Sequence, residues 1–352
     1  MITRLTTDAE EAQGISYGAP FVDIYSSSWG PPDDGRRLDG ARFLSQEVLE
    51  AVVNGNPSHP HLHARGGKGA IYIWASGNGN AAGDNCNYDS WANSRYTITV
   101  AAITDLDAVA HYSERCSAVL VASPSSGGKR SITTSARRKG EIYCTYSFGG
   151  TSAAAPSIAG VVALILEANP KVTWRDVQHI LIHSSSHPYT QPDLQLNGGA
   201  LIYSHALGFG VPSATNAVVL ASQWSLVGPV QVVEYFSHVN LVIPDHGAGL
   251  KACRTVTERY FVEHVEVVFS ANHPRRGDLE IRLYDELGVQ SRLAELHNDL
   301  NADYTAWRFM SVAYWDSESN GEWCLTVRDK RTAMLGTWES WMLRIWGRQA
   351  LD

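Results

Sequence analysis

The sequence predicts an α/β fold with a mostly parallel sheet flanked by helices, followed by an all-β sandwich. Two observations carry this prediction. Short apolar runs alternate with helical patterns up to about residue 225, and strands that alternate with helices pair in parallel. After Val227 the hydrophobic period becomes two, which is typical of antiparallel strands with one buried face. The predicted domains are therefore residues 1–225 and 228–350.

Each predicted element has its own local signal. Apolar and β-branched residues bounded by Gly, Asn or Asp predict strands at 22–28, 69–76 and 96–104. Apolar residues at helical spacing predict a helix over 41–54 and another near Ser152, with Pro156 in its first turn. Thr173 is expected to cap a further helix. Alternating polar and apolar residues predict the sandwich strands at 264–271, 279–286, 323–329 and 340–347.

Composition argues against two classes of protein. The formal net charge of -8 argues against a nucleic-acid-binding protein, whose surface would be basic. No apolar run reaches the roughly 18 residues that a membrane-spanning helix needs, and the first residues are acidic where a signal peptide would be apolar. We therefore expect neither a nucleic-acid partner nor a membrane segment or signal peptide in this chain, and its acidic surface suits cationic partners.

The cysteines and a cluster of histidines leave their roles open. None of the five cysteines forms a close Cys-x-x-Cys pair, so a zinc site is not favoured, and an odd number leaves at least one thiol unpaired: Cys86, Cys116, Cys144, Cys253 and Cys324. His59, His61 and His63 could bind a metal. Their Pro-interrupted segment is more typical of a surface loop.

The segment 148–158, FGGTSAAAPSI, contains the candidate nucleophile Ser152. Two glycines allow a sharp turn, the alanines leave room for a substrate carbonyl, and the start of a helix offers a positive dipole end. The same composition fits a plain junction between a loop and a helix. The segment alone therefore leaves both interpretations open.

Polar residues also gather where the predicted strands end, which is where open α/β sheets bind ligands. Asn78, in WASGNGN, could donate its amide to an oxyanion, or could be a turn residue with positive φ. A set of acids could bind calcium, which takes oxygen ligands in irregular geometry, or basic side chains. Loop acids are commonly just solvated. The acids are Asp33, Asp34, Asp39, Asp84, Asp89 and Glu114.

Together these motifs resemble the kexin and furin group of subtilisin-like serine endoproteases, the proprotein convertases. The matching segments occur in order and at compatible spacing: SSSWGPPDDG, WASGNGN, DNCNYD, YSERCS, GGTSAAAP and LEANPKVTWRDVQH. The β-rich remainder, with NHPRRGDLEIRLYDELG and SNGEW, resembles the P domain, or Homo B domain, of this group. The resemblance covers most of residues 1–225 and implies a secretory-pathway enzyme, in the Golgi or secreted, that cleaves proproteins after paired basic residues.

The resemblance implies roles for individual residues in substrate cleavage. Ser152 would be the nucleophile and Asn78 the oxyanion-hole donor. Four carboxylates would bind basic substrate side chains, the first two at the P1 position and the last two nearer P4: Asp33, Asp89, Glu11 and Asp39. Buried carboxylates of this kind would reject neutral side chains, because these would leave them unpaired.

The resemblance also implies a structural Ca²⁺ behind the P1 pocket, held by three carboxylates: Asp33, Asp84 and Glu114. Cys86 and Cys116 match a disulfide of the family. Cys144 matches a cysteine whose partner lies further upstream than this sequence reaches. A bridge between Cys253 and Cys324 is left open.

The sequence departs from the family where the general base should be. In this group an Asp and a His precede the serine, and both lie upstream of anything that matches SSSWGPPDDG. About twenty residues precede that region here, with Asp8 and Asp23 but no His. The expectation is a chain that begins inside the protease domain and is inactive as given, because nothing deprotonates Ser152. The alternative is a non-catalytic substrate-binding or regulatory pseudoprotease.

Overall fold

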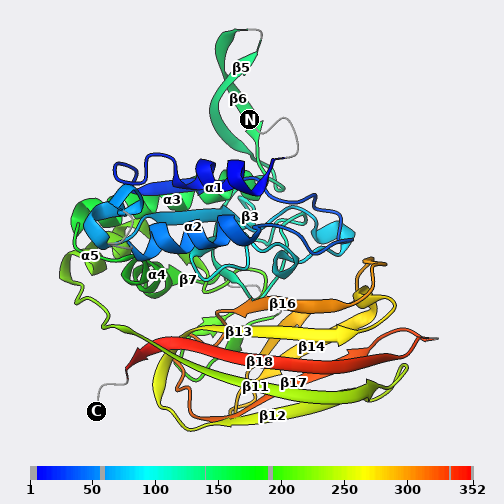
Figure 1. Ribbon diagram of the computed structural model, residues 1–352. Coiled ribbons are helices and arrows are strands. Elements are labelled where there is room, and N and C mark those ends of the chain that lie inside the picture. The colour runs from blue at the N-terminus through cyan, green and yellow to red at the C-terminus, as the bar shows by residue number, and fades with distance from the viewer. Residues whose placement is uncertain (1–5, 56–59, 139, 189–192, 333, 350–352) are drawn as a thin grey trace.

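The computed structural model describes residues 6–55, 60–138, 140–188, 193–332 and 334–349. Helices surround a parallel sheet in the first part of the chain, and two antiparallel sheets pack face to face below it (Figure 1). The fold class predicted from the sequence is therefore confirmed.

A four-stranded parallel sheet in the order β1-β2-β3-β4 forms the centre of the first part. Its strands are β1 (Ile24–Ser27), β2 (Ile71–Ala75), β3 (Thr97–Ile103) and β4 (Val119–Pro124). All of β3 and nearly all of β2 and β4 are buried, which explains their continuous apolar runs. The sequence analysis did not predict β4.

Among the described residues, five α-helices pack around this sheet or on one another: α1 (Asp8–Ser16), α2 (Phe43–Asn54), α3 (Thr151–Ala168), α4 (Trp174–His183) and α5 (Ala214–Gln223). Thr173 caps α4 in a reciprocal pair with Asp176, as predicted. Among the described helices, α3 alone is long and apolar enough to cross a membrane, so the expectation that no segment reaches that length is wrong for α3. It packs across β1 to β4 and against α5, as the core helix of this part.

Pro156 lies in the second turn of α3, so the prediction that it occupies the first turn is wrong. Proline has no amide hydrogen, and the carbonyl of Ser152, four residues earlier, therefore lacks its helical donor. The Ser28 hydroxyl donates to that carbonyl at 3.2 Å. This hydrogen bond ties the end of β1 to the first turn of α3.

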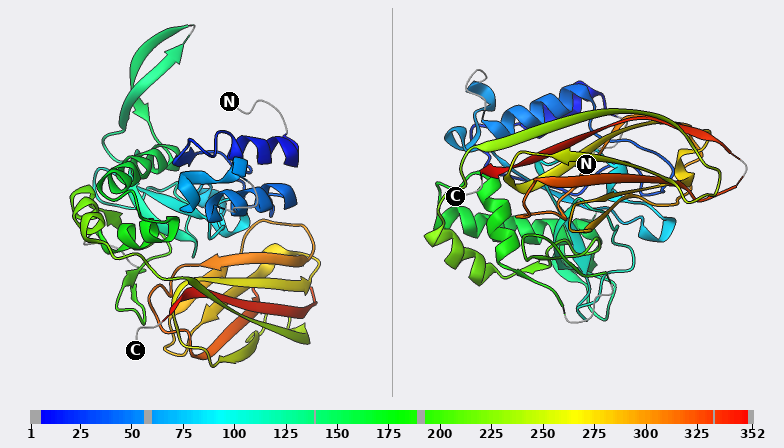
Figure 2. Two further views of the ribbon diagram at one scale, coloured as in Figure 1. Left: turned by 60° about the vertical axis from the view of Figure 1, so that its left-hand side comes forward. Right: turned by 90° about the horizontal axis from the view of Figure 1, so that it is seen from below.

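A two-stranded hairpin, β5 (Ile132–Arg138) and β6 (Glu141–Phe148), projects from the body of the protein and leads directly into α3 (Figures 1 and 2). The side chains of Ile142 and Tyr146 on β6 are exposed, and Cys144 is an exposed free thiol. Two shorter pairs lie after α4: β7 (Ser185–Ser186) with β10 (Val211–Pro212), and β8 (Gln195–Leu196) with β9 (Ile202–Tyr203).

The second part is a sandwich of two antiparallel sheets. One has the order β11-β18-β13-β16, with β11 (Val230–Ile243), β18 (Gly336–Gln349), β13 (Tyr260–Asn272) and β16 (Tyr304–Ser311). The other has the order β12-β17-β14-β15, with β12 (Leu250–Val256), β17 (Gly321–Asp329), β14 (Leu279–Tyr284) and β15 (Gln290–Ala294). Cys253 and Cys324 face each other on β12 and β17 and form a disulfide.

Candidate functional site

The site lies at the edge of the parallel sheet where the carboxyl ends of its strands meet. The loop after β1 carries Asp33 and Asp39, the loop after β2 carries Asn78 and two further acids, and Glu114 precedes β4. Because the strands are parallel, these loops converge although they are far apart in sequence. Glu11 reaches the same region from α1, and Ser152 from the start of α3.

Three acids from separate loops converge at this edge. One carboxylate oxygen each of Asp33, Asp84 and Glu114 lies within 4.8 Å of the other two. Glu114 is buried and accepts the amide hydrogen of Gly79 at 2.9 Å. A side chain at Gly77 would come within 2.1 Å of the Glu114 carboxylate, so glycine is required where the backbone passes this acid.

The proximity of these acids changes their protonation. Burial, together with nearby acids including Asp33, raises the pKa of Asp84 to about 6 and that of Asp89 to about 8. Burial, followed by the charges of Asp84 and Asp33, raises the pKa of Glu114 well above its usual value. An oxygen-only set of acids under mutual repulsion fits a hard cation such as Ca²⁺.

Asp89 completes the wall of the same small pocket. Its Oδ1 accepts the amide hydrogen of Trp91 at 2.8 Å, and its Oδ2 faces Gly30, where an added side chain would come within 2.8 Å. The pocket between the acids holds about 20 Å³, which suits an ion or a water molecule but not an arginine side chain.

Glu11 and Asp39 line a second, larger pocket of about 300 Å³, whose walls include Trp29 and Trp91. Oε1 of Glu11 accepts a hydrogen bond from the Thr6 hydroxyl at 2.6 Å. Its Oε2 is buried without a hydrogen-bond partner. A buried, unpaired carboxylate oxygen between aromatic walls is suited to a basic side chain.

Asn78 lies beside the first turn of α3. Its Oδ1 accepts hydrogen bonds from the amide of Thr151 at 2.9 Å and from its hydroxyl at 3.1 Å. Its Nδ2 is 3.4 Å from Oδ2 of Asp33. These contacts hold the Asn78 amide next to the residue that precedes Ser152, at the positive end of the helix dipole.

Ser152 itself is half-buried, and within the described ranges no side chain is hydrogen-bonded to its hydroxyl. Its backbone is positioned by neighbours of Gly150. The Ser125 hydroxyl donates to the Gly150 carbonyl at 2.7 Å, and Gly150 has a φ of 76°, which favours glycine.

Comparison with protein families agrees with this architecture. The Subtilase family model matches residues 3–210, and the Proprotein convertase P-domain model matches residues 262–345. The chain belongs to the subtilase family.

Relatives of this subtilase include the proprotein convertases. Furin of Rattus norvegicus is 36% identical over 363 residues, which cover 99% of this chain and 44% of furin. Proprotein convertase subtilisin/kexin type 6 of Rattus norvegicus is 35% identical over 367 residues, which cover 97% and 37%. The chain therefore spans less than half the length of these curated relatives.

Solved structures share the fold of this subtilase. The Aeromonas sobria serine protease in complex with its chaperone superposes with a TM-score of 0.82 at 17% identity, covering 96% of this chain and 74% of that protein. A second structure of that protease gives a TM-score of 0.79 at 18% identity, covering 93% and 72%. At these identities the likeness concerns the fold alone.

The P domain of this subtilase supports the loop that carries Asp84 and Asp89. Asn87 is fully buried in that loop, accepts the amide hydrogen of Met310 at 2.9 Å and donates to its carbonyl at 3.2 Å. Trp307 donates its indole hydrogen to the Asn87 carbonyl at 3.0 Å. The backbone of β16 is thus hydrogen-bonded to a side chain of a loop in the protease domain. The Cys86–Cys116 disulfide joins this loop to the loop that carries Glu114.

The sequence analysis missed Asn87 as a supporting residue. An asparagine between a cysteine and a tyrosine has no distinct signal and reads as a turn residue. Its partner on β16 is more than two hundred residues away, and only the packing of the two domains brings them together.

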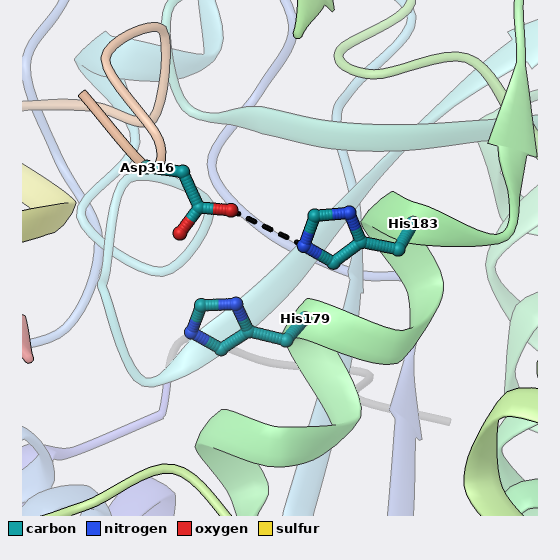
Figure 3. Close-up of side chains that lie close together, drawn as sticks. All are labelled: His179, His183 and Asp316. Carbon is teal, nitrogen blue, oxygen red and sulfur yellow. Dashed lines mark ion pairs between the residues drawn. The ribbon is translucent and has the colours of Figure 1, made fainter. Parts of the chain in front are cut away.

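A cluster of titratable residues lies where α4 meets the P domain, and Figure 3 shows three of them, His179, His183 and Asp316. Nε2 of His183 is 3.2 Å from Asp316, while His179 contacts Glu263 through Nε2 at 3.0 Å and accepts the Trp315 indole hydrogen on Nδ1 at 3.1 Å. Both nitrogens of His179 are therefore occupied, and the cluster joins the domains. Of the histidines near residue 60, His59 lies outside the described residues, and neither His61 nor His63 joins a three-ligand cluster among the described residues.

Proposed function

We propose that this chain supplies the nucleophile and the substrate cleft of a calcium-dependent serine endopeptidase that cleaves proproteins after paired basic residues. The convergence of carboxylates beside the first turn of α3 is the observation that carries the proposal. Asp33, one of these acids, contacts Asn78, whose Oδ1 accepts the amide hydrogen of Thr151, and this arrangement supports the proposal. Membership in the subtilase family and the match to a convertase P domain support it.

Ser152 would attack the scissile carbonyl, and its own amide and the Asn78 side chain would donate to the resulting oxyanion. The oxyanion forms at the positive end of α3, which favours negative charge. The hydroxyl proton must go to a general base. No described side chain is hydrogen-bonded to this hydroxyl, and we propose that a residue outside the described ones supplies the base.

Substrate choice would follow from two acidic positions. Asp33 and Asp89 would pair with a basic P1 side chain, and Glu11 and Asp39 with a basic residue nearer P4. A neutral side chain would leave these carboxylates unpaired, which makes its rejection strong.

Calcium would be held by Asp33, Asp84 and Glu114, where its charge would neutralise three crowded carboxylates. It would hold the loops that carry Asp33 and Asp89 at a fixed separation. Two disulfides and the family favour an oxidising compartment of the secretory pathway, where the partners would be proproteins with paired basic residues.

Peptide binding tests the proposal without requiring turnover. We expect a fluorescent Arg-Ala-Lys-Arg peptide to bind the chain in the presence of Ca²⁺, as measured by fluorescence anisotropy. Asp89→Asn should weaken binding roughly tenfold or more, because it removes a charge-assisted contact. Glu167→Gln, at an exposed position of α3, is the matched control and should bind like the unmodified chain. Equal binding of an Ala-Ala-Ala-Ala peptide would contradict the proposal.

Turnover by this chain alone is expected to be absent. Losing the general base costs several orders of magnitude in rate, so a fluorogenic Arg-Ala-Lys-Arg substrate should stay intact. Hydrolysis that disappears in the Ser152→Ala variant would show that a base is present after all.

A further inference from the structure

A pocket of about 460 Å³ lies between the protease domain and the P domain. The protease domain contributes residues 38–42, Gln46 of α2 and Ser90. The P domain contributes β13, β16 and β18 through Val268, Trp307, Arg308 and Arg344. Of the residues that line this pocket, the proposed function uses only Asp39.

The pocket contains a guanidinium group whose hydrogen-bonding capacity is largely unused. The closest acidic contact of Arg308 is an ion pair at 3.8 Å with Glu266, and its Nε is buried without a hydrogen-bond partner. Glu266 is buried and already accepts hydrogen bonds from Arg344 at 3.1 Å and from the Trp346 indole at 3.2 Å. Both of these donors use Oε2 of Glu266, whereas Nε of Arg308 faces Oε1 at 3.8 Å, which is too long for a hydrogen bond. The Arg308 guanidinium therefore makes no hydrogen bond to Glu266 and can still donate to a carboxylate from outside.

This pocket adjoins the pocket of Glu11. Asp39, Gly40 and Arg42 line both. A peptide whose P4 basic residue pairs with Glu11 and Asp39 would have to pass only residues 39–42 to reach Arg308. The peptide residues that would lie beside Arg308 are those before P4.

We propose that the interdomain pocket is a further substrate subsite, which binds an acidic side chain located before the P4 residue. Its carboxylate pairs with Arg308 of the P domain, and Trp307 forms the adjoining apolar wall for the methylene groups. In this arrangement the P domain contacts the substrate and contributes to its selection. The inference rests on the proposed function, because the basic residues of the substrate set the direction of the chain.

The backbone of Arg308 is fixed by the protease domain. The side-chain amide of Asn93 donates to the Arg308 carbonyl at 2.8 Å and to the Asn87 carbonyl at 2.9 Å. A single buried amide thus connects the loop that carries Asp89 with the residue of the proposed subsite. The two binding positions therefore have a fixed separation.

Paired peptides and paired variants test the subsite. Arg-Ala-Lys-Arg peptides are extended toward the amino terminus and carry either Glu or Gln at successive positions before the P4 arginine. We expect one Glu peptide to bind the unmodified chain roughly fivefold more tightly than its Gln counterpart, in anisotropy measurements with Ca²⁺. Arg308→Gln should remove this preference and leave the affinity for the Gln peptide unchanged. Arg328→Gln, exposed on β17 of the other sheet, should keep the preference.

The outcomes separate this inference from the proposed function. If peptides with the basic motif bind but Glu and Gln peptides bind equally at every position, the subsite is wrong and the proposed function stands. If no peptide with the basic motif binds, both fall. Arg308→Lys keeps the positive charge and should therefore retain part of the preference for the Glu peptide. Near-ultraviolet circular dichroism verifies that each variant keeps its tertiary packing. Loss of the preference in Arg328→Gln would also overturn the assignment.

Discussion

Asp84, Asp89 and Glu114 are held close together by two loops, the one after β2 and the one after β3. Each of these acids has a raised pKa because burial and neighbouring charge disfavour ionisation. A folded-state pKa above the unfolded value adds stability below the unfolded pKa, and this contribution is lost as pH rises through the folded pKa. For both acids this stability begins to be lost above the ordinary pKa of 3.8. The loss is complete above about pH 6 for Asp84 and above about pH 8 for Asp89.

This yields a prediction at the scale of single residues. In a calcium chelator, the free energy of unfolding measured with urea should fall by about 2 kcal/mol between about pH 5 and about pH 8. Added Ca²⁺ should stabilise the protein more at the higher pH, because it binds the ionised carboxylates. Asp84→Asn should reduce both effects, and an identical pH slope with and without Ca²⁺ would argue against a cation at these acids.

Side-chain identity was the part of the site that could be predicted from sequence. The motifs named Asp33, Asp84 and Glu114, and the three carboxylates do lie together. Their assigned roles remain predictions. Arg308 had no motif and was not predicted, because its long contact with Glu266 arises only where β16 pairs with β13.

At the scale of elements, strand β16 acts as a support for a loop of the other domain. Its Met310 backbone exchanges two hydrogen bonds with the buried Asn87 side chain, as a neighbouring strand would. The described part of the loop that carries Asp89 has only two short helices of its own, η3 (Asn80–Ala82) and η4 (Cys86–Tyr88), so the contacts with β16 help to fix its position.

Removing this support should affect both stability and binding. Asn87→Ala leaves the Met310 amide without its partner, and we expect a loss of about 1–3 kcal/mol in urea unfolding. The affinity for the Arg-Ala-Lys-Arg peptide should fall as well, because Asp89 is no longer held in place. Asn216→Ala, at an exposed position of α5, is the comparison variant. A stability loss with no change in affinity would mean that β16 supports the fold and not the site.

Elements with strong periodicity were predictable, and those with ambiguous composition were not. Strands β2 and β3 have β-branched runs, and α2 has helical spacing, so each was predicted within a few residues. Strand β4 reads VLVASP, whose small polar residues weaken the strand signal. Pro156 was placed one turn too early, because a donor from Ser28 offsets the missing hydrogen bond inside α3.

For the whole molecule, a buried ion pair joins the protease domain to the P domain. Arg175 of α4 donates two hydrogen bonds to Glu263 of β13, at 2.6 and 2.7 Å, and His179 adds a third contact. Burial alone would raise the pKa of Glu263, but the hydrogen bonds from His179 and Arg175 outweigh it and lower the pKa to about 2. The stability that this pair contributes is present above about pH 4.5 and is lost as pH falls toward about 2.

Breaking the pair should uncouple the domains. Glu263→Gln leaves a buried guanidinium without its counter-charge, and we expect the free energy of unfolding to fall by about 3–5 kcal/mol. Unfolding, monitored by tryptophan fluorescence, should then occur in two steps. Glu318→Gln disrupts an exposed pair with Arg259 and should cost less than about 1 kcal/mol. Equal effects of the two changes would show that the domain interface does not depend on the buried pair.

Local patterns were enough to predict the fold class, the order of the two domains and the family, because periodicity and short motifs are properties of neighbouring residues. The exact boundary between residues 225 and 228 stays a prediction. Tertiary packing alone decided that β16 holds the Asp89 loop, that Glu263 bridges to α4, and that an unsatisfied arginine faces an interdomain pocket. These features depend on contacts between residues far apart in the chain, whose pairing is set by how two folded domains bury their surfaces against each other.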